Sequence, residues 1–153
     1  MLLMKDVKII MVGDETKESL DIIHILESLD CEVQYLAFTG EEALEKALQS
    51  PPDFIITDII LEGDIDGIEL ASNAKEHDIP VIFLTTPVPE DVIQKAMETE
   101  PCGYLVKPFE NTELKFAIEM AAYKKRLKMS SDGVINVSKL VWTLERWSTG
   151  NTT

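Results

Sequence analysis

Residues 54–61 read Phe-Ile-Ile-Thr-Asp-Ile-Ile-Leu. The stretch begins with a short apolar run that ends in a threonine and is followed by an aspartate. The run at 54–57 is too short for a helix and rich in isoleucine, which predicts a strand buried on both faces. A more mixed run at 32–38 is typical of an edge strand. Three further runs resemble the first, at residues 7–12, 81–84 and 104–106. The chain is therefore expected to contain five strands.

Apolar residues at helical spacing fill the intervals between these strands. Thr39-x-x-Glu42 forms a capping box that opens the second helix, and Pro89 suits the first turn of the fourth. The five stripes are Ile22, Ile25, Leu26 and Leu29; Ala43, Leu44, Ala47 and Leu48; Leu70, Ala71 and Ala74; Val92, Ile93, Ala96 and Met97; and Leu114, Ala117, Ile118 and Ala121. Five strand–helix units predict an α/β fold, a flavodoxin-like (βα)5 doubly wound parallel sheet with strand order 2-1-3-4-5.

The strand–helix pattern stops near Lys128, which predicts one domain over residues 1–128 and a linker-like tail over 129–153. The tail opens with Ser, Asp and Gly, which favour a turn. Five of its apolar residues fall at helical spacing and predict a short amphipathic helix, with a frayed tail as the alternative. These residues are Val137, Leu140, Val141, Leu144 and Trp147.

Charge and composition exclude several classes of function. Asp and Glu total 28 against 14 for Lys and Arg, a net charge of −14 that disfavours binding to nucleic acid and to anionic membranes. No stretch approaches the ~20 apolar residues that span a bilayer, so a cytoplasmic, soluble chain is expected. Cys31 and Cys102 are interpreted as reduced, buried thiols, with a disulfide as the alternative. No glycine-rich phosphate loop is present, which disfavours nucleotide binding.

Polar residues close four of the five predicted strands. Asp14 follows the first strand, Asp58 the third, Thr85 the fourth and Lys107 the fifth. Ligands of such sheets bind beyond the carboxyl ends of the strands. Clustered carboxylates suit a hard cation such as Mg²⁺, and a lysine and a hydroxyl suit phosphoryl oxygens. The sequence therefore predicts a site for phosphoryl transfer to an aspartate.

These motifs, in this order and spacing over residues 5–125, resemble those of two-component response regulator receiver domains. The finer likeness is to receivers attached to archaeal multidomain sensor kinases. The motifs are Gly13-Asp14-Glu15, Asp58-Ile59-Ile60-Leu61, Asp66-Gly67, Thr85 and Gly103-Tyr104-Leu105-Val106-Lys107-Pro108-Phe109.

The resemblance implies a role for each matching residue. Asp58 would accept a phosphoryl group from a histidine kinase. Mg²⁺ would be held by Asp14, by Asp58 and by the backbone carbonyl of Ile60. Lys107 would pair with the phosphoryl group beside a cis Lys107–Pro108 bond, and the Thr85 hydroxyl would move onto it. The domain would then assist its own phosphorylation and dephosphorylation without being a conventional metabolic enzyme.

We expect the output face to be made of the fourth helix, the fifth strand and the fifth helix, because Tyr104 on the fifth strand lies near Lys107 along the chain. The ring of Tyr104 would follow the movement of Thr85, although packing alone is an equal interpretation. A homodimer could form through this face, with the basic cluster at residues 124–126 pairing with acids of a second copy.

Several alternatives stay open. Asp14 could N-cap the first helix, and Asp66 in the loop at 61–67 is interpreted as a solvated acid. Receivers commonly carry two adjacent acids after the first strand, and here the first is Gly13. Thr86 likewise stands where a small residue is usual. A pseudo-receiver, a binding module independent of phosphorylation, is therefore the competing function.

Overall fold

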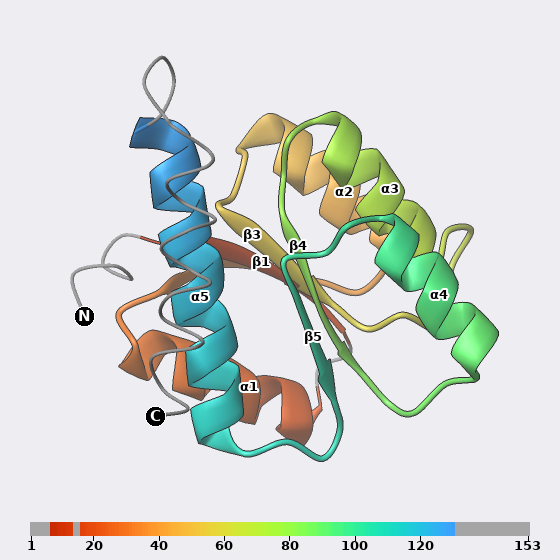
Figure 1. Ribbon diagram of the computed structural model, residues 1–153, viewed down its shortest axis with the longest axis horizontal. Helices are drawn as coiled ribbons and strands as arrows, with labels where there is room; N and C mark the ends of the chain where they lie inside the picture. The colour runs from red at the N-terminus through yellow and green to blue at the C-terminus, as the bar shows by residue number, and fades with distance from the viewer. Residues whose placement is uncertain (1–6, 14–15, 131–153) are drawn as a thin grey trace, which may run out of the picture.

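Five parallel strands form one sheet in the order β2-β1-β3-β4-β5, which confirms the predicted fold class and strand order (Figure 1). The computed structural model describes residues 7–13 and 16–130. The strands are β1 (Lys8–Val12), β2 (Glu32–Ala37), β3 (Phe54–Thr57), β4 (Val81–Thr85) and β5 (Gly103–Val106). β2 lies at one edge, as its mixed composition predicts.

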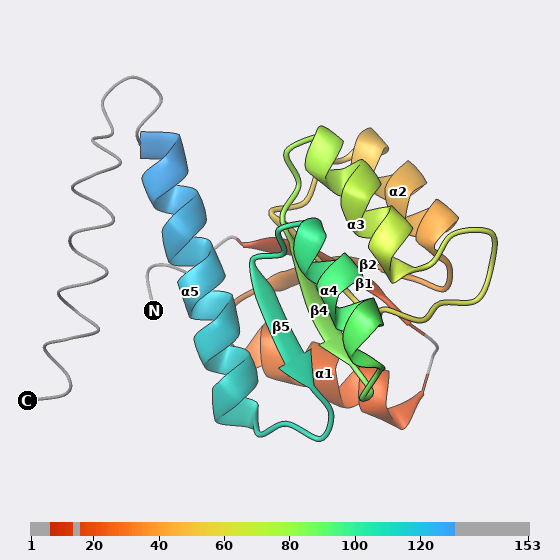
Figure 2. The same ribbon diagram turned by 45° about the vertical axis from the view of Figure 1, so that its right-hand side comes forward.

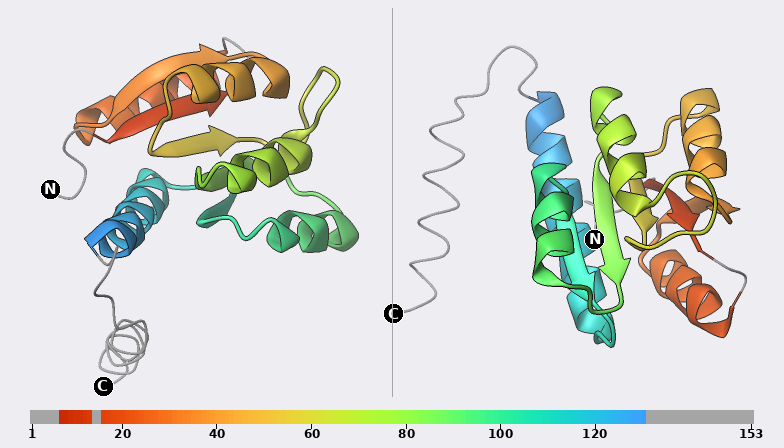
Figure 3. Two further views of the ribbon diagram at one scale, coloured as in Figure 1. Left: turned by 90° about the horizontal axis from the view of Figure 1, so that it is seen from above. Right: turned by 90° about the vertical axis from the view of Figure 1, so that its right-hand side faces the viewer.

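Helices cover both faces of this sheet (Figure 3). α1 (Lys17–Ser28) and α5 (Asn111–Ser130) lie on one face, and α5 runs alongside β5 (Figure 2). The opposite face carries α2 (Gly40–Gln49), α3 (Gly67–Glu76) and α4 (Glu90–Glu98). None of the helices in the described ranges combines the length and the apolar character needed to cross a membrane.

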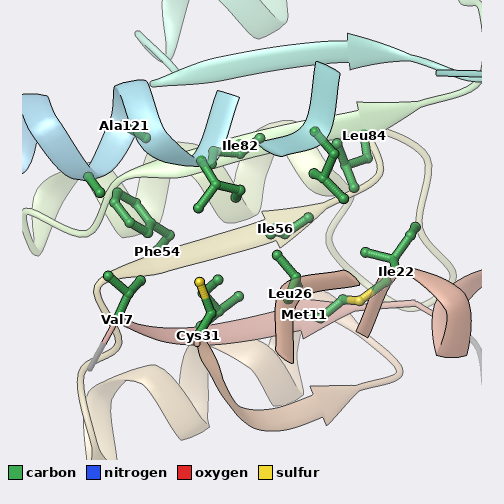
Figure 4. Close-up of a cluster of buried hydrophobic side chains, with 14 residues drawn as sticks. Val7, Met11, Ile22, Leu26, Cys31, Phe54, Ile56, Ile82, Leu84 and Ala121 are labelled. Atoms are coloured by element: carbon green, nitrogen blue, oxygen red, sulfur yellow. The ribbon is translucent and has the colours of Figure 1, made fainter. Parts of the chain in front are cut away.

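The strands contribute side chains to two separate hydrophobic cores, one on each face of the sheet, because successive residues of a strand point to opposite faces. Phe54 and Ile56 of β3 pack with Leu26 of α1 and Ala121 of α5 (Figure 4). Ile55, between them in sequence, packs in the second core with residues of α2, α3 and α4. All of β3 is buried, which explains its uninterrupted apolar sequence.

Strand register brings the predicted site residues to one edge of the sheet. Val12 of β1 pairs with Thr57 of β3, and Thr85 of β4 pairs with Val106 of β5. The next residues along these strands, among them Asp58 and Lys107, therefore emerge at the same carboxyl edge.

Helix caps correct three interpretations of the sequence. The side chain of Thr16 accepts a hydrogen bond from the Ser19 N–H at 3.2 Å and is the N-cap of α1, so the N-cap alternative for Asp14 is wrong. Asp66 is not merely a solvated acid, because its carboxylate caps α3 through the Glu69 N–H at 2.8 Å. Pro89 is the N-cap residue of α4 and does not lie in its first turn.

Thr39 caps α2 as the capping box predicts, accepting a hydrogen bond from the Glu42 N–H at 3.1 Å. The return bond differs by one residue, because the Glu42 carboxylate accepts from the Phe38 N–H at 2.8 Å and not from that of Thr39.

The carboxyl-terminal helix extends further than the sequence pattern indicates. α5 is described as far as Ser130, beyond the predicted end of the domain at residue 128. The predictions for the tail at 131–153 and for Asp14 as a metal ligand lie outside the described residues. Both cysteines are free thiols, so the disulfide alternative is wrong. Burial is the main cause that raises the pKa of each thiol to about 11.

Lys125 was expected in an exposed basic cluster but is tied to the sheet. Its ammonium lies 2.9 Å from Asp53 Oδ1, 3.2 Å from the Asp53 carbonyl and 5.7 Å from the ring centre of Phe54. Asp53 precedes β3, and its carboxylate also accepts from the Lys8 N–H at 2.8 Å. These contacts join α5 to β1 and β3 at the amino edge of the sheet, and they remove Lys125 from the proposed contact with a second copy.

Candidate functional site

Asp58 lies directly beyond β3, and its two carboxylate oxygens have different surroundings. Oδ1 accepts hydrogen bonds from the Ile59 N–H at 2.7 Å and from the Thr85 hydroxyl at 2.6 Å, with the Ile60 N–H at 3.4 Å. Oδ2 has a single contact of 3.5 Å with Lys107 Nζ among the described residues. The side chain is 23% exposed, so Oδ2 is the oxygen left open for chemistry.

Thr85 is the last residue of β4 and is fully buried. Its hydroxyl carries one proton and has two acceptors in reach, Asp58 Oδ1 at 2.6 Å and the Thr86 carbonyl at 3.0 Å. The shorter contact joins it to the aspartate. The alternative that Thr85 is only a favourable strand residue does not account for this bond. Thr86 is exposed, and its contribution here is the backbone carbonyl that lies near the Thr85 hydroxyl.

Lys107 follows β5, and its backbone continues the ladder between β4 and β5 by donating to the Thr85 carbonyl at 2.8 Å. The Lys107–Pro108 bond is cis, as expected. The Lys107 ammonium lies 2.5 Å from Glu18 Oε1 and 3.5 Å from Asp58 Oδ2. Glu18 was not predicted as a site residue. The one signal for it in the sequence was its place in the first turn of the helix that follows the first strand.

Gly67 at the start of α3 packs directly against the backbone of Asp58 and Ile59. Its N–H donates to the Ile59 carbonyl at 2.7 Å. A Cβ at this position would lie 2.0 Å from the Asp58 carbonyl oxygen and 2.8 Å from the Ile59 Cα. Only glycine allows this approach, so the Asp66-Gly67 motif acts through backbone packing. The sequence singled out the motif without indicating this role.

The loop that leads from Asp58 to α3 is also anchored on α2. The Glu41 carboxylate accepts hydrogen bonds from the Ile65 N–H at 2.9 Å and the Asp64 N–H at 3.2 Å. These two bonds lower the pKa of Glu41. Gly63 adopts φ of 107° against this carboxylate, a conformation that favours glycine. The anchor restricts the conformation of the loop that carries Ile60.

A cleft of about 510 Å³ opens between the loops that follow β1 and β3. Three acidic residues line it, Glu18, Asp58 and Glu62, together with Gly13 and Ile60. Oxygen donors of this kind suit Mg²⁺, which keeps several waters as ligands. Within the described ranges, no three acidic, histidine or cysteine side chains converge closely enough to hold a metal ion alone. Asp14, the other predicted carboxylate ligand, lies outside those ranges.

Tyr104 of β5 connects the site to the rest of the sheet. Its ring meets Phe83 edge to face, with the ring centres 6.2 Å apart. Its hydroxyl is buried and has no hydrogen-bond partner among the described residues. Burial, and then the negative charge of Asp58, raise the pKa of Tyr104. The side chain therefore packs against the second core, near enough to Asp58 for that charge to act on its hydroxyl.

Known proteins with the same arrangement identify the kind of domain. The family model for the response regulator receiver domain matches residues 9–119. The transcriptional regulatory protein PdtaR of Mycobacterium tuberculosis is 30% identical over 129 residues, which are 84% of this chain and 62% of the relative. The heme response regulator HssR of Staphylococcus haemolyticus is 30% identical, over 88% of this chain and 58% of the relative. The chain thus spans about three fifths of these relatives.

Solved structures agree with these sequence relatives. The signal receiver domain of a modulated diguanylate cyclase from Desulfovibrio desulfuricans has a TM-score of 0.75 and 34% identity, covering 81% of this chain and 99% of that one. The N-terminal domain of a response regulator/sensory box/GGDEF 3-domain protein from Carboxydothermus hydrogenoformans has a TM-score of 0.71 and 31% identity, covering 80% and 98%.

Proposed function

Because the chain belongs to the response regulator receiver domains, which act in phosphorylation-dependent two-component signalling, we propose that Asp58 accepts a phosphoryl group from a histidine kinase. The observation that carries the proposal is the unequal pairing of the Asp58 carboxylate. Oδ1 is fixed by its three donors, whereas among the described residues Oδ2 has one long contact, with Lys107. An oxygen held in position but weakly paired is suited to act as a nucleophile.

In the proposed transfer, Asp58 Oδ2 attacks the phosphorus of a phosphohistidine. The phosphorus–nitrogen bond breaks, and its electron pair stays on the ring nitrogen. Histidine leaves as a neutral imidazole with its proton on the other ring nitrogen, and Asp58 becomes an acyl phosphate. Lys107 stabilises the negative charge on the transferred oxygens. The N–H groups of Ile59 and Ile60 keep the carboxylate in the orientation needed for attack.

Asp58, Asp14 and the backbone carbonyl of Ile60 are the proposed ligands for Mg²⁺. The ion would neutralise charge on the phosphoryl oxygens when bound. The support for it is chemical, since the described lining of the cleft supplies oxygen donors. By the same means the domain would assist the later hydrolysis of its own acyl phosphate.

The proposed output depends on Thr85. Phosphorylation adds negative charge beside the Thr85 hydroxyl. The hydroxyl would then move from Asp58 Oδ1 and donate its hydrogen bond to a phosphoryl oxygen. Tyr104, whose hydroxyl has no hydrogen-bond partner within residues 7–13 and 16–130, is the group proposed to respond. Met97 of α4, Val106 of β5 and Phe116 of α5 are each more than two fifths exposed, which favours this surface as a contact face for a second copy or another protein.

Intact mass measurement tests the acceptor. Incubation with Mg²⁺ and phosphoramidate should add the mass of one phosphoryl group to the wild-type chain and to Asp53→Asn. Asp58→Asn should gain no mass. Asp53→Asn is the matched control, because it makes the same change at the other end of the same strand.

Equal labelling of Asp58→Asn and wild type would refute the assignment of Asp58. A chain that takes no label at all would instead favour the pseudo-receiver, the alternative suggested by Gly13 in place of an acid. Such a module would bind its partner equally well with and without Mg²⁺ and phosphodonor.

A further inference from the structure

Within the part of the chain that the structure describes, Lys107 contacts two carboxylates from different elements, and it contacts them unequally. Glu18 Oε1 lies 2.5 Å from its ammonium, a close ion pair, while Asp58 Oδ2 lies a full 3.5 Å away. The Lys107 side chain is 23% exposed and that of Glu18 is 59% exposed. Lys107 is therefore paired more closely with Glu18 of α1 than with Asp58, the proposed acceptor.

The backbone of Glu18 is well anchored for such a contact. Glu18 lies in the first turn of α1, one residue before the buried Ser19. The cap bond from the Ser19 N–H to Thr16 fixes this turn. Thr16, Glu18 and Lys107 all line the cleft that contains Asp58. The Glu18 carboxylate thus faces the site from a fixed helix end.

We infer that Glu18 is a positioning residue that holds Lys107 away from Asp58 until a phosphoryl group arrives. The inference rests on the proposed phosphorylation of Asp58. A carboxylate carries one negative charge, and a phosphoryl group brings about −1.5 to −2. The added charge shifts the balance, so that Lys107 moves from Glu18 to the phosphoryl oxygens. Glu18 then sets how much of the lysine's attraction is available to the incoming group.

Gly13 gives this arrangement a particular importance. The cleft carries no acid at position 13, so Lys107 has no carboxylate partner from that position. Glu18 reaches the lysine from the next element and supplies a negative charge there. The effect differs from that of a metal ligand, because it acts on the lysine and through it on the phosphoryl group.

The rate of labelling by phosphoramidate and Mg²⁺ tests the inference. Glu18→Gln removes the charge of the competing carboxylate, so labelling of Asp58 should become about two- to fivefold faster, the range that a partly exposed ion pair represents. Glu27→Gln, an equal change of charge at the far end of α1, should label at the wild-type rate. Glu18→Asp keeps the charge but shortens the side chain, and it should resemble Glu18→Gln because the pair depends on reach.

A second comparison separates action through Lys107 from general repulsion of the phosphodonor. In a Lys107→Met background, adding Glu18→Gln should leave the labelling rate unchanged, since the lysine that Glu18 restrains is gone. A wild-type chain that takes no label would refute the proposed function and this inference with it. If the wild type is labelled but Glu18→Gln matches it, or if Glu18→Gln still accelerates labelling without Lys107, the inference alone is wrong.

Discussion

The two ends of β3 carry the same pair of residue types and use them differently. Asp53 before the strand meets Lys125 at 2.9 Å, and Asp58 after it meets Lys107 at 3.5 Å. Asp53 is paired on both oxygens, through Lys125 and the Lys8 N–H. Among the described residues, Asp58 Oδ2 is only weakly paired, because Lys107 lies closer to Glu18 than to Asp58. We call the fully paired Asp53–Lys125 contact the closed pair and the weakly paired Asp58–Lys107 contact the open pair. The closed pair stabilises the fold, whereas the open pair leaves an aspartate oxygen and an ammonium able to bind a ligand.

The backbone beneath the open end gives the largest expected effect. Gly67→Ala would place a Cβ 2.0 Å from the Asp58 carbonyl, so the backbone at Asp58 and Ile59 must move. We expect a loss of about 2–4 kcal/mol in the free energy of unfolding and at least a tenfold slower labelling of Asp58. Urea unfolding and intact mass would measure the two effects.

Gly103→Ala is the control for this prediction, because the three atoms nearest its Cβ belong to the side chain of Ile82, the closest at 3.2 Å, and not to the backbone. Wild-type stability and labelling in Gly67→Ala would mean that the Asp58 backbone does not depend on this close approach.

Removing each lysine in turn should separate the two ends of β3. Lys125→Met loses an ion pair, a hydrogen bond and a contact with the Phe54 ring, so the free energy of unfolding should fall by about 1–2 kcal/mol. Its labelling rate should stay at the wild-type value. Lys107→Met should change the free energy of unfolding by less than about 0.5 kcal/mol and slow labelling at least tenfold. Similar losses of stability in both variants would contradict the distinction between a closed and an open pair.

Adding an acid at the open end should strengthen cation binding. Gly13→Asp supplies a carboxylate that can accept hydrogen bonds from water on Mg²⁺, support worth about 10- to 100-fold in affinity. We expect a gain near the lower limit, because the new Cβ would lie 3.2 Å from Ser19 Oγ and the hydroxyl must shift. Mg²⁺ titration followed by intrinsic fluorescence or NMR would measure it. An unchanged titration would place the metal elsewhere and remove the basis for Asp14 as a ligand.

The smallest effect concerns the Glu41 anchor and its dependence on pH. Hydrogen bonds from Ile65 and then Asp64 lower the pKa of Glu41 below its ordinary value of 4.5. A lowered pKa contributes stability above the unfolded-state value, and that contribution is lost as pH falls through the folded-state value. The difference in stability between wild type and Glu41→Gln should therefore be larger at about pH 7 than at about pH 3.

Glu98→Gln, which changes an exposed carboxyl near the end of α4, is the control in these unfolding measurements. A wild-type advantage over Glu41→Gln that does not shrink in acid would show that the anchor does not depend on the ionised carboxylate.

Local pattern was sufficient for the fold because the signal repeats along the chain. Five apolar runs and five helical stripes fixed the layers, and chirality restricted the strand order. The helix starts were harder, since several polar residues near each start can act as caps. The sequence offered Asp14 as a possible cap of α1, whereas the side-chain hydrogen bond in the structure comes from Thr16, two residues further on.

Asp58, Thr85 and Lys107 could be predicted together from the sequence, because parallel strands end at one edge of a sheet and each residue follows a recognisable strand. Contacts between residues of separate elements could not be predicted in this way. Lys125 and Asp53 are 72 positions apart, and Lys107 and Glu18 lie on different elements. Such pairs depend on side-chain reach and on the packing angle of helices against the sheet, which no local periodicity encodes. The sequence by itself determined which residues reach the carboxyl edge, and only the tertiary structure decided which lysine is closed into the fold and which stays open.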